Sequence, residues 1–282
     1  LSLINKKTEI EDVLNETERQ TADLQDTLLE QEKSIIELAE EIKKKNRVFL
    51  LGMGASHFIN HMFAVQLRTL GYWAIAVPAS EFYYDSFDVS DTQVILTSQS
   101  GESIETVKCL ERIKQLNPFC VTLEPNSTLG SQCRSIIAAG GAEKAFAGTR
   151  SVTLTIGIFS FVYDILNGTT GETMNAIGPV EKSEILQKAI NSISHKSELI
   201  ITGRGIYCGL AELMRLGCEE LSGISSICYE GGQLRHGPLE VFDFNSTLVI
   251  FRQSGIQGQL ATSFEEISNK SGVKLIVFDS SG

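Results

Sequence analysis

The 282-residue sequence lacks several features that would by themselves indicate a function. No apolar run reaches the ~18–20 residues needed to cross a bilayer, because Ser, Thr and Tyr interrupt the longest candidate, residues 151–166. Positive charge is scarce, with 24 Lys and Arg against 35 Asp and Glu and a net charge of −11. None of the six cysteines forms a Cys-x-x-Cys pair. These absences argue against a membrane protein, a nucleic-acid-binding protein and a disulfide or zinc scaffold.

Targeting and nucleotide motifs are missing as well. The sequence begins at Leu1 and is charged within its first ten residues, which is unlike a signal peptide. Neither Gly-x-x-x-x-Gly-Lys nor Gly-x-Gly-x-x-Gly occurs, so no phosphate loop of an NTPase and no dinucleotide fingerprint is present. We therefore expect a cytoplasmic protein with reduced thiols and no nucleotide cofactor.

The composition is that of a globular chain, with 42% apolar and 21% charged residues. A helix-forming segment, residues 8–45, precedes a region in which short apolar runs alternate with helical patterns. Strands are expected at 47–51, 73–78, 94–97 and 119–123, and helices at 57–70, 104–116 and 151–166. This alternation predicts an α/β fold with a parallel sheet flanked by helices.

The second half of the sequence repeats the first. Residues 47–54 align with 199–205, and residues 94–101 align with 248–255, at offsets of 151 and 154 residues. Two matches in order predict a duplicated α/β unit. We expect a helical segment at 1–45, a first domain at 46–170 and a second at 171–282. The second copy is expected to be incomplete, since it breaks off soon after the apolar run 274–278.

A serine-rich loop, Ser98-Gln-Ser-Gly-Glu-Ser103, lies between a predicted strand and a predicted helix. Its hydroxyls and the free N–H groups of a helix start suit a phosphate at the carboxyl end of a parallel strand. An ordinary helix N-cap explains the same pattern. Ser56 follows a Gly-x-Gly turn at the end of another predicted strand. The repeat has Arg252 where Ser98 stands, which favours a single anion site in the first half.

Two further residues suit proton transfer. Glu220 lies beside Glu219, and His236 follows 16 residues later, before Gly237 and Pro238. A carboxylate and an imidazole are common general acids and bases. A solvated helix residue for Glu220, and a loop-stabilising hydrogen bond for His236, are the structural alternatives.

Taken together, these motifs resemble the tandem sugar isomerase (SIS) family, including the isomerase half of glucosamine-6-phosphate synthase and related deaminases and fructosamine-6-phosphate deglycases. The resemblance covers residues 30–282 and rests on six segments: Gly52-Met-Gly-Ala-Ser56, Ser98-Gln-Ser-Gly-Glu-Ser103, Glu143-Lys-Ala-Phe-Ala-Gly-Thr-Arg150, Gly203-Arg-Gly205, Cys218-Glu-Glu-Leu-Ser222 and Arg235-His-Gly-Pro238. It implies two SIS domains, each an αβα sandwich, in a homo-oligomer that binds a sugar phosphate.

The resemblance also implies roles for single residues. Substrate-binding positions are Ser56, Ser98, Gln99, Ser100, Ser103, Phe146 and Thr149, with Ser103 standing where Thr is typical. Glu220 matches the carboxylate that transfers a proton between C1 and C2 of the sugar. His236 matches a histidine that assists ring opening and that comes from the neighbouring subunit in relatives. No metal or other cofactor is required by this chemistry.

Two departures from the family narrow the expected reaction. There is no glutaminase domain with an N-terminal cysteine, so the synthase reaction from glutamine is not supported. The tail that carries a Schiff-base lysine in the synthase lies beyond Gly282 or is absent. We expect a phosphosugar isomerase or deaminase that acts through an enediol or enolamine. The alternatives are a fructosamine-6-phosphate deglycase, and a sensor that binds sugar phosphates without turnover.

Overall fold

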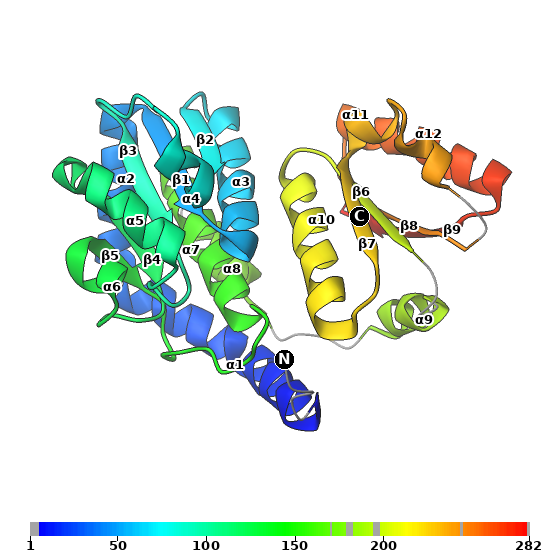
Figure 1. Ribbon diagram of the computed structural model, residues 1–282, viewed down its shortest axis with the longest axis horizontal. Coiled ribbons are helices and arrows are strands. Elements are labelled where there is room, and N and C mark those ends of the chain that lie inside the picture. Colours follow the sequence, from blue (N-terminus) through cyan, green and yellow to red (C-terminus); the bar gives the residue numbers. More distant parts are fainter. Residues whose placement is uncertain (1–5, 170, 179–182, 194–197, 243–244, 281–282) are drawn as a thin grey trace. The chain divides into compact units, whose positions relative to one another are not determined.

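The computed structural model describes residues 6–169, 171–178, 183–193, 198–242 and 245–280 (Figure 1). The chain divides into two compact units, Leu1–Val180 and Glu181–Gly282, here called the first and second units. In the described ranges no helix is long and apolar enough to span a membrane.

The first unit is built on a parallel sheet whose strands lie in the order β2-β1-β3-β4-β5. Its elements are α1 (Lys6–Glu30), α2 (Glu32–Lys45), β1 (Arg47–Gly52), α3 (Gly54–Thr69), β2 (Trp73–Pro78), α4 (Ala79–Tyr84), β3 (Gln93–Thr97), α5 (Ile104–Ile113), a 3₁₀ turn (Lys114–Leu116), β4 (Phe119–Thr122), α6 (Thr128–Gln132), β5 (Arg134–Ile137), α7 (Arg150–Asn167) and α8 (Glu172–Ala176).

Helices cover both faces of this sheet. Successive side chains of a strand point to opposite faces, so each strand contributes to both layers of the core. Phe49 and Leu51 pack in one core cluster with Phe82 of α4 and Leu110 of α5. The alternate residues of β1 face the layer that contains α2, α3 and α7, where Phe63 and Phe159 stack at 4.4 Å between ring centroids. The buried runs in β1 and β3 are those of a strand covered on both sides.

The long predicted N-terminal helix is two helices, since Gln31 lies outside both α1 and α2. α1 and α2 each pack against α7. The contact between α1 and α7 includes a buried ion pair, in which Arg150 Nε lies 2.5 Å from Glu16 Oε2. The N-terminal helices are therefore part of the first unit's core.

The second unit has a parallel sheet of order β7-β6-β8-β9, which repeats the order of the first four strands of the first unit. Its elements are α9 (Glu184–Ser192), β6 (Leu199–Gly203), α10 (Ile206–Gly217), a π-helical turn (Cys218–Ser222), β7 (Ser226–Glu230), α11 (Gly231–Leu234), a 3₁₀ turn (Pro238–Val241), β8 (Thr247–Arg252), α12 (Ile256–Ser271) and β9 (Lys274–Asp279).

The second sheet is also covered on both faces. Ile201 packs with Ala211 of α10 on one face, and Ile200 packs with Leu234 of α11 and Phe264 of α12 on the other. The predicted α/β fold with parallel sheets flanked by helices is thus confirmed. The sequence analysis did not predict α4, α6 or β5, and the incompleteness of the second copy stays a prediction.

Candidate functional site

The candidate site of the first unit lies where the direction of strand connection reverses. β2 lies on one side of β1 and β3 on the other, so β1 and β3 form the switch point at which α/β proteins commonly bind ligands. Gly52 ends β1 opposite Thr97 of β3. A side chain at Gly52 would place its Cβ only 2.9 Å from Thr97 O, so this close approach requires glycine.

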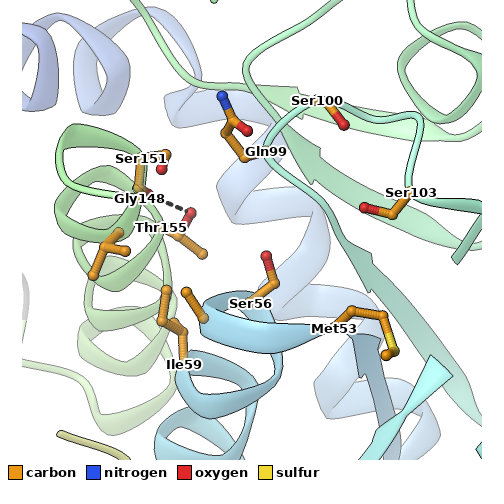
Figure 2. A pocket seen from close by; sticks show the side chains of 11 residues that line it. Met53, Ser56, Ile59, Gln99, Ser100, Ser103, Gly148, Ser151 and Thr155 are labelled. Atoms are coloured by element: carbon orange, nitrogen blue, oxygen red, sulfur yellow. Dashed lines mark hydrogen bonds between the residues drawn. The ribbon is translucent and has the colours of Figure 1, made fainter. Parts of the chain in front are cut away.

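A pocket of about 180 Å³ opens at this point between α3, α7 and the loop after β3 (Figure 2). Figure 2 shows Ser56 on α3, Gln99, Ser100 and Ser103 across from α7, and Ser151 and Thr155 on α7 itself. The lining residues are Met53, Ala55, Ser56, Ile59, Gln99, Ser100, Ser103, Gly148, Ser151, Val152 and Thr155.

The serine loop is held from behind by hydrogen bonds to neighbouring segments. The carbonyl of Gln99 accepts from Thr122 Oγ1 and Leu123 N, both at 3.0 Å. Glu102 turns away from the pocket and accepts from Thr128 N at 2.6 Å and Thr128 Oγ1 at 2.9 Å. These contacts fix the loop before any ligand binds, which is the preorganisation that a binding site needs.

Gly101 sets the bend of the same loop. Its φ of +65° is in the left-handed region, and a Cβ at this position would collide with Ser127 Oγ. Ser98 is buried behind the loop and its Oγ lies 3.0 Å from Ser103 Oγ. Ser98 therefore orients Ser103, which lines the pocket.

Two helices begin at the pocket without a side-chain cap. Neither Met53, which precedes α3, nor Ser103, which precedes α5, caps its helix with a side-chain hydrogen bond. The first N–H groups of a helix have no partner within the helix and carry partial positive charge. An anion in this pocket would meet both helix starts as well as the hydroxyl groups.

The start of α7 differs because a carboxylate occupies it. Glu143 Oε1 accepts from Thr149 N at 3.0 Å, Thr149 Oγ1 at 2.9 Å and Ser151 N at 3.1 Å, and Glu143 Oε2 accepts from Ser151 Oγ. Thr155 Oγ1 donates to the carbonyl of Ser151 at 2.8 Å. The sequence analysis missed Ser151 and Thr155, although their spacing of four residues places both on one helix face.

The structure brings together four of the seven residues proposed for substrate binding: Ser56, Gln99, Ser100 and Ser103. Thr149 does not line the pocket, and its N–H and hydroxyl both donate to Glu143. Phe146 is 54% exposed and does not line the pocket either. Ser98 lies outside the lining as well, and the binding roles of all seven residues stay predictions.

The proton-transfer candidates are both on the second unit. Glu220 lies in the π-helical turn after α10, and π-helical turns often occur at functional sites. Burial raises the pKa of Glu220, and the neighbouring charge of Glu219 raises it further. Glu219 forms an ion pair with Arg215 at 2.6 Å. For Glu220 no hydrogen bond or ion pair is recorded within the described part of the chain.

His236 is exposed in the turn that follows α11. Its backbone N–H donates to Gln233 O at 3.0 Å, and Gly237 after it has a φ of +124°. Glu230 fixes the start of α11 by accepting from Gly232 N at 2.7 Å and Gln233 N at 3.0 Å. The imidazole is therefore presented on an ordered turn.

The corresponding switch point of the second unit is filled by ion pairs. Arg204 follows β6 and lies 3.2 Å from Glu230. Arg252, which replaces Ser98 in the repeat, donates to Asp279 through Nε at 2.9 Å and through Nη2, and it donates to Glu265 through Nη1. Both cations already have carboxylate partners, which agrees with a single anion site in the first unit.

Comparisons with known proteins agree with this architecture. Residues 41–163 match the model of the SIS domain family. The curated glutamine–fructose-6-phosphate aminotransferase (isomerizing) of Sulfurisphaera tokodaii is 23% identical over 263 residues, which are 90% of this chain and 44% of that protein. The chain spans less than half the length of the curated relatives it matches.

Two solved structures show the same fold. The C-terminal domain of glucosamine-fructose-6-phosphate aminotransferase from Francisella tularensis has a TM-score of 0.82 at 24% identity, and the match covers 95% of this chain and 84% of that one. The glucosamine-6-phosphate deaminase of Thermotoga maritima has a TM-score of 0.77 at 19% identity, with coverages of 95% and 84%.

Proposed function

Since residues 41–163 match the model of the SIS domain family, we propose that this protein is an enzyme of the phosphosugar isomerase and deaminase type. The observation that carries the proposal is the pocket at the β1–β3 switch point, where hydroxyl groups and two uncapped helix starts converge. Such a site suits a phosphate, because N–H groups and hydroxyls can surround its oxygens. The relatives named above carry sugar phosphates in their names, which supports the same ligand class.

In the proposed mechanism, the phosphate of a sugar 6-phosphate binds to Ser100, Ser103 and Gln99 at the starts of α3 and α5. These phosphate contacts are remote from the reacting carbons and supply the binding energy that positions them. The preformed serine loop means that little ordering is needed when the sugar binds.

Glu220 is proposed as the group that moves a proton between C1 and C2 through an enediol or enolamine. A carboxylate with a raised pKa is a better proton acceptor than an ordinary one, and burial supplies that shift here. His236 is proposed to protonate the ring oxygen and open the sugar ring. In a substrate that carries nitrogen, water then hydrolyses the imine and releases ammonia.

Two alternatives lead to different products or to none. A fructosamine-6-phosphate deglycase would use the same proton transfer and release an amino acid instead of ammonia. A sensor would need the serine loop but neither Glu220 nor His236. Among the described residues Glu220 has no hydrogen-bond or ion-pair partner, whereas Glu219 is paired with Arg215, and this difference favours an enzyme.

A substrate panel tests the proposal. The purified chain is incubated in deuterated buffer with sugar 6-phosphates, amino-sugar 6-phosphates and a fructosamine 6-phosphate, and NMR follows ketose, ammonia, amino acid and deuterium at C1 and C2. We expect turnover or exchange with at least one compound. Tight binding without exchange in every case would replace the enzyme by the sensor, and no binding at all would refute the proposed function.

A further inference from the structure

The two sides of the first-unit pocket differ in what they can offer to a ligand. One side consists of the serine loop with the uncapped starts of α3 and α5. The other side is α7, which presents Ser151 and Thr155 (Figure 2). A hydroxyl carries one proton and two lone pairs, so the destination of that proton decides whether the group donates or accepts.

On the α7 side, both hydroxyl protons are already used within the protein. Ser151 Oγ donates to Glu143 Oε2, and Thr155 Oγ1 donates to Ser151 O at 2.8 Å. Both side chains are buried, with exposures of 5% and 6%, so water competes little for these bonds. The oxygen atoms of Ser151 and Thr155 therefore offer only lone pairs to a ligand.

Glu143 keeps the Ser151 hydroxyl in the role of an acceptor toward a ligand. Its carboxylate has no proton to give back to Ser151, and it accepts the N–H groups at the start of α7 that would otherwise attract an anion. The α7 side thus combines two acceptor oxygens with a negative charge directly behind them. We call Glu143, Ser151 and Thr155 the acceptor wall.

The serine-loop side retains donors. Ser100 Oγ accepts from Glu102 N at 3.2 Å, which leaves its own proton for a ligand. Ser98 Oγ and Ser103 Oγ lie 3.0 Å apart, so one of the two protons bridges them and the other remains. A phosphate is accordingly attracted to one side of the pocket and disfavoured on the other.

We propose that the acceptor wall determines the substrate specificity of the pocket: it accepts hydroxyl or ammonium groups of a phosphosugar and rejects a second anionic group. This inference rests on the proposed function and names its substrate class. Ser151 and Thr155 contact the sugar, and Glu143 is a positioning residue that acts through Ser151. A carboxylate at C1 would face lone pairs and a like charge, with no donor to compensate its lost hydration.

Calorimetry with four probes tests the proposal. The probes are inorganic phosphate, glucose 6-phosphate, glucosamine 6-phosphate and 6-phosphogluconate, which carries a carboxylate at C1. We expect glucose 6-phosphate and glucosamine 6-phosphate each to bind at least about tenfold more tightly than 6-phosphogluconate, a difference of about 1.4 kcal/mol. Equal affinity for 6-phosphogluconate and glucose 6-phosphate would overturn the acceptor wall and leave the phosphate site intact. Failure of every probe to bind would instead refute the proposed function.

Variants distinguish a specific contribution of the acceptor wall to binding from a general disturbance of the structure. Thr155→Val keeps the size of the side chain and should weaken sugar-phosphate binding several-fold while leaving phosphate binding unchanged. Thr153→Val is the matched control, because Thr153 lies on α7 outside the pocket lining and donates to Gln20 at 2.7 Å. Glu143→Gln should reduce the ratio of the affinity for glucose 6-phosphate to the affinity for 6-phosphogluconate. A ratio unchanged in both Glu143→Gln and Thr155→Val would contradict the proposal.

Discussion

Arg215 and Glu219 form an ion pair one turn apart at the end of α10, with Arg215 Nη1 2.6 Å from Glu219 Oε2. Glu220, the next residue, has no recorded partner of this kind in the described ranges. Adjacent side chains on a helix point about 100° apart, so only one of the two carboxylates faces a given ligand. Both carboxylates are exposed, but Glu219 is engaged by Arg215, so Glu220 is the one we propose for proton transfer.

Glu220→Gln should abolish proton exchange at C1 and C2, because the amide cannot accept a proton. General acid–base catalysis contributes ~10²–10⁴-fold, so turnover should fall by at least about 100-fold while the dissociation constant of the sugar phosphate changes little. Glu219→Gln is the control and should retain exchange. If Glu219→Gln abolishes exchange and Glu220→Gln does not, the assignment of the two residues is reversed.

The raised pKa of Glu220 predicts a pH dependence with a definite direction. Only the ionised form accepts a proton, so activity should fall on acidification at a pH above that of an ordinary glutamate. Because the folded-state pKa lies above the unfolded one, ionised Glu220 destabilises the fold above its folded-state pKa. That penalty disappears as the pH falls to the unfolded value.

Thermal unfolding measures the stability half of this prediction. Glu220→Gln should raise the melting temperature at neutral pH, and the gain should vanish in acid. Glu219→Gln removes a partner of Arg215 and should give no gain. A lower melting temperature of Glu220→Gln at neutral pH would contradict the direction of the shift.

The serine loop should be sensitive to changes in its hydroxyls and in its bend. Ser100→Ala removes a hydrogen bond to a charged group, worth about 1.5–3 kcal/mol, and should weaken phosphate and sugar-phosphate binding accordingly. Gly101→Ala should weaken binding more, because its φ of +65° and the contact with Ser127 force the loop to move. Unchanged affinity of the Ser100→Ala variant in calorimetry would place the phosphate elsewhere.

The resemblance to relatives with shared sites predicts that His236 acts across a subunit interface. Mixing Glu220→Gln protein with His236→Ala protein should then restore part of the activity through hybrid sites. The expected recovery is up to about one quarter of wild type for random dimers with one intact site in half of them. Absence of recovery, with subunit exchange shown by native mass spectrometry, would mean that each site is built within one chain.

Local patterns in the sequence were sufficient for the α/β fold and for the serine loop. The buried run of β1 ends at Gly52, and the buried run of β3 is followed directly by Ser98. Each strand and its turn residue are neighbours in the chain, so the pattern of apolar residues and the turn residues identify them. β5 was missed because it is only four residues long and contains Arg134 and Ser135. A short strand at an edge leaves little periodic signal.

The acceptor wall was missed for a different reason. Ser151 and Thr155 look like polar interruptions of an apolar helix, and Glu143 precedes them in a loop without periodicity. Only the fold brings the carboxylate of Glu143 to the start of α7. The pairing of Arg150 with Glu16 spans 134 residues and has no local signal at all.

The pairing of Arg150 with Glu16 should contribute strongly to the stability of the first unit. Arg150 is fully buried and donates to Glu16 at 2.5 Å, to Ala139 O at 2.6 Å and to Gly141 O at 2.7 Å. It also pairs with Asp23 at 3.1 Å. Arg150 thereby ties α1 and the loop before α7 to the first turn of α7.

Arg150→Met should destabilise the first unit by about 3–5 kcal/mol, because it leaves the buried Glu16 charge without its partner. Burial alone would raise the pKa of Glu16, but hydrogen bonds from Lys144 N and Arg150 outweigh it and lower the pKa. The stability that the pair contributes is present above the unfolded pKa of a glutamate and is lost as the pH falls through the lower folded value. Urea unfolding at pH 7 and in acid measures both effects: the cost of Arg150→Met should shrink in acid, and an equal cost at both pH values would show that Glu16 is not the group that depends on Arg150.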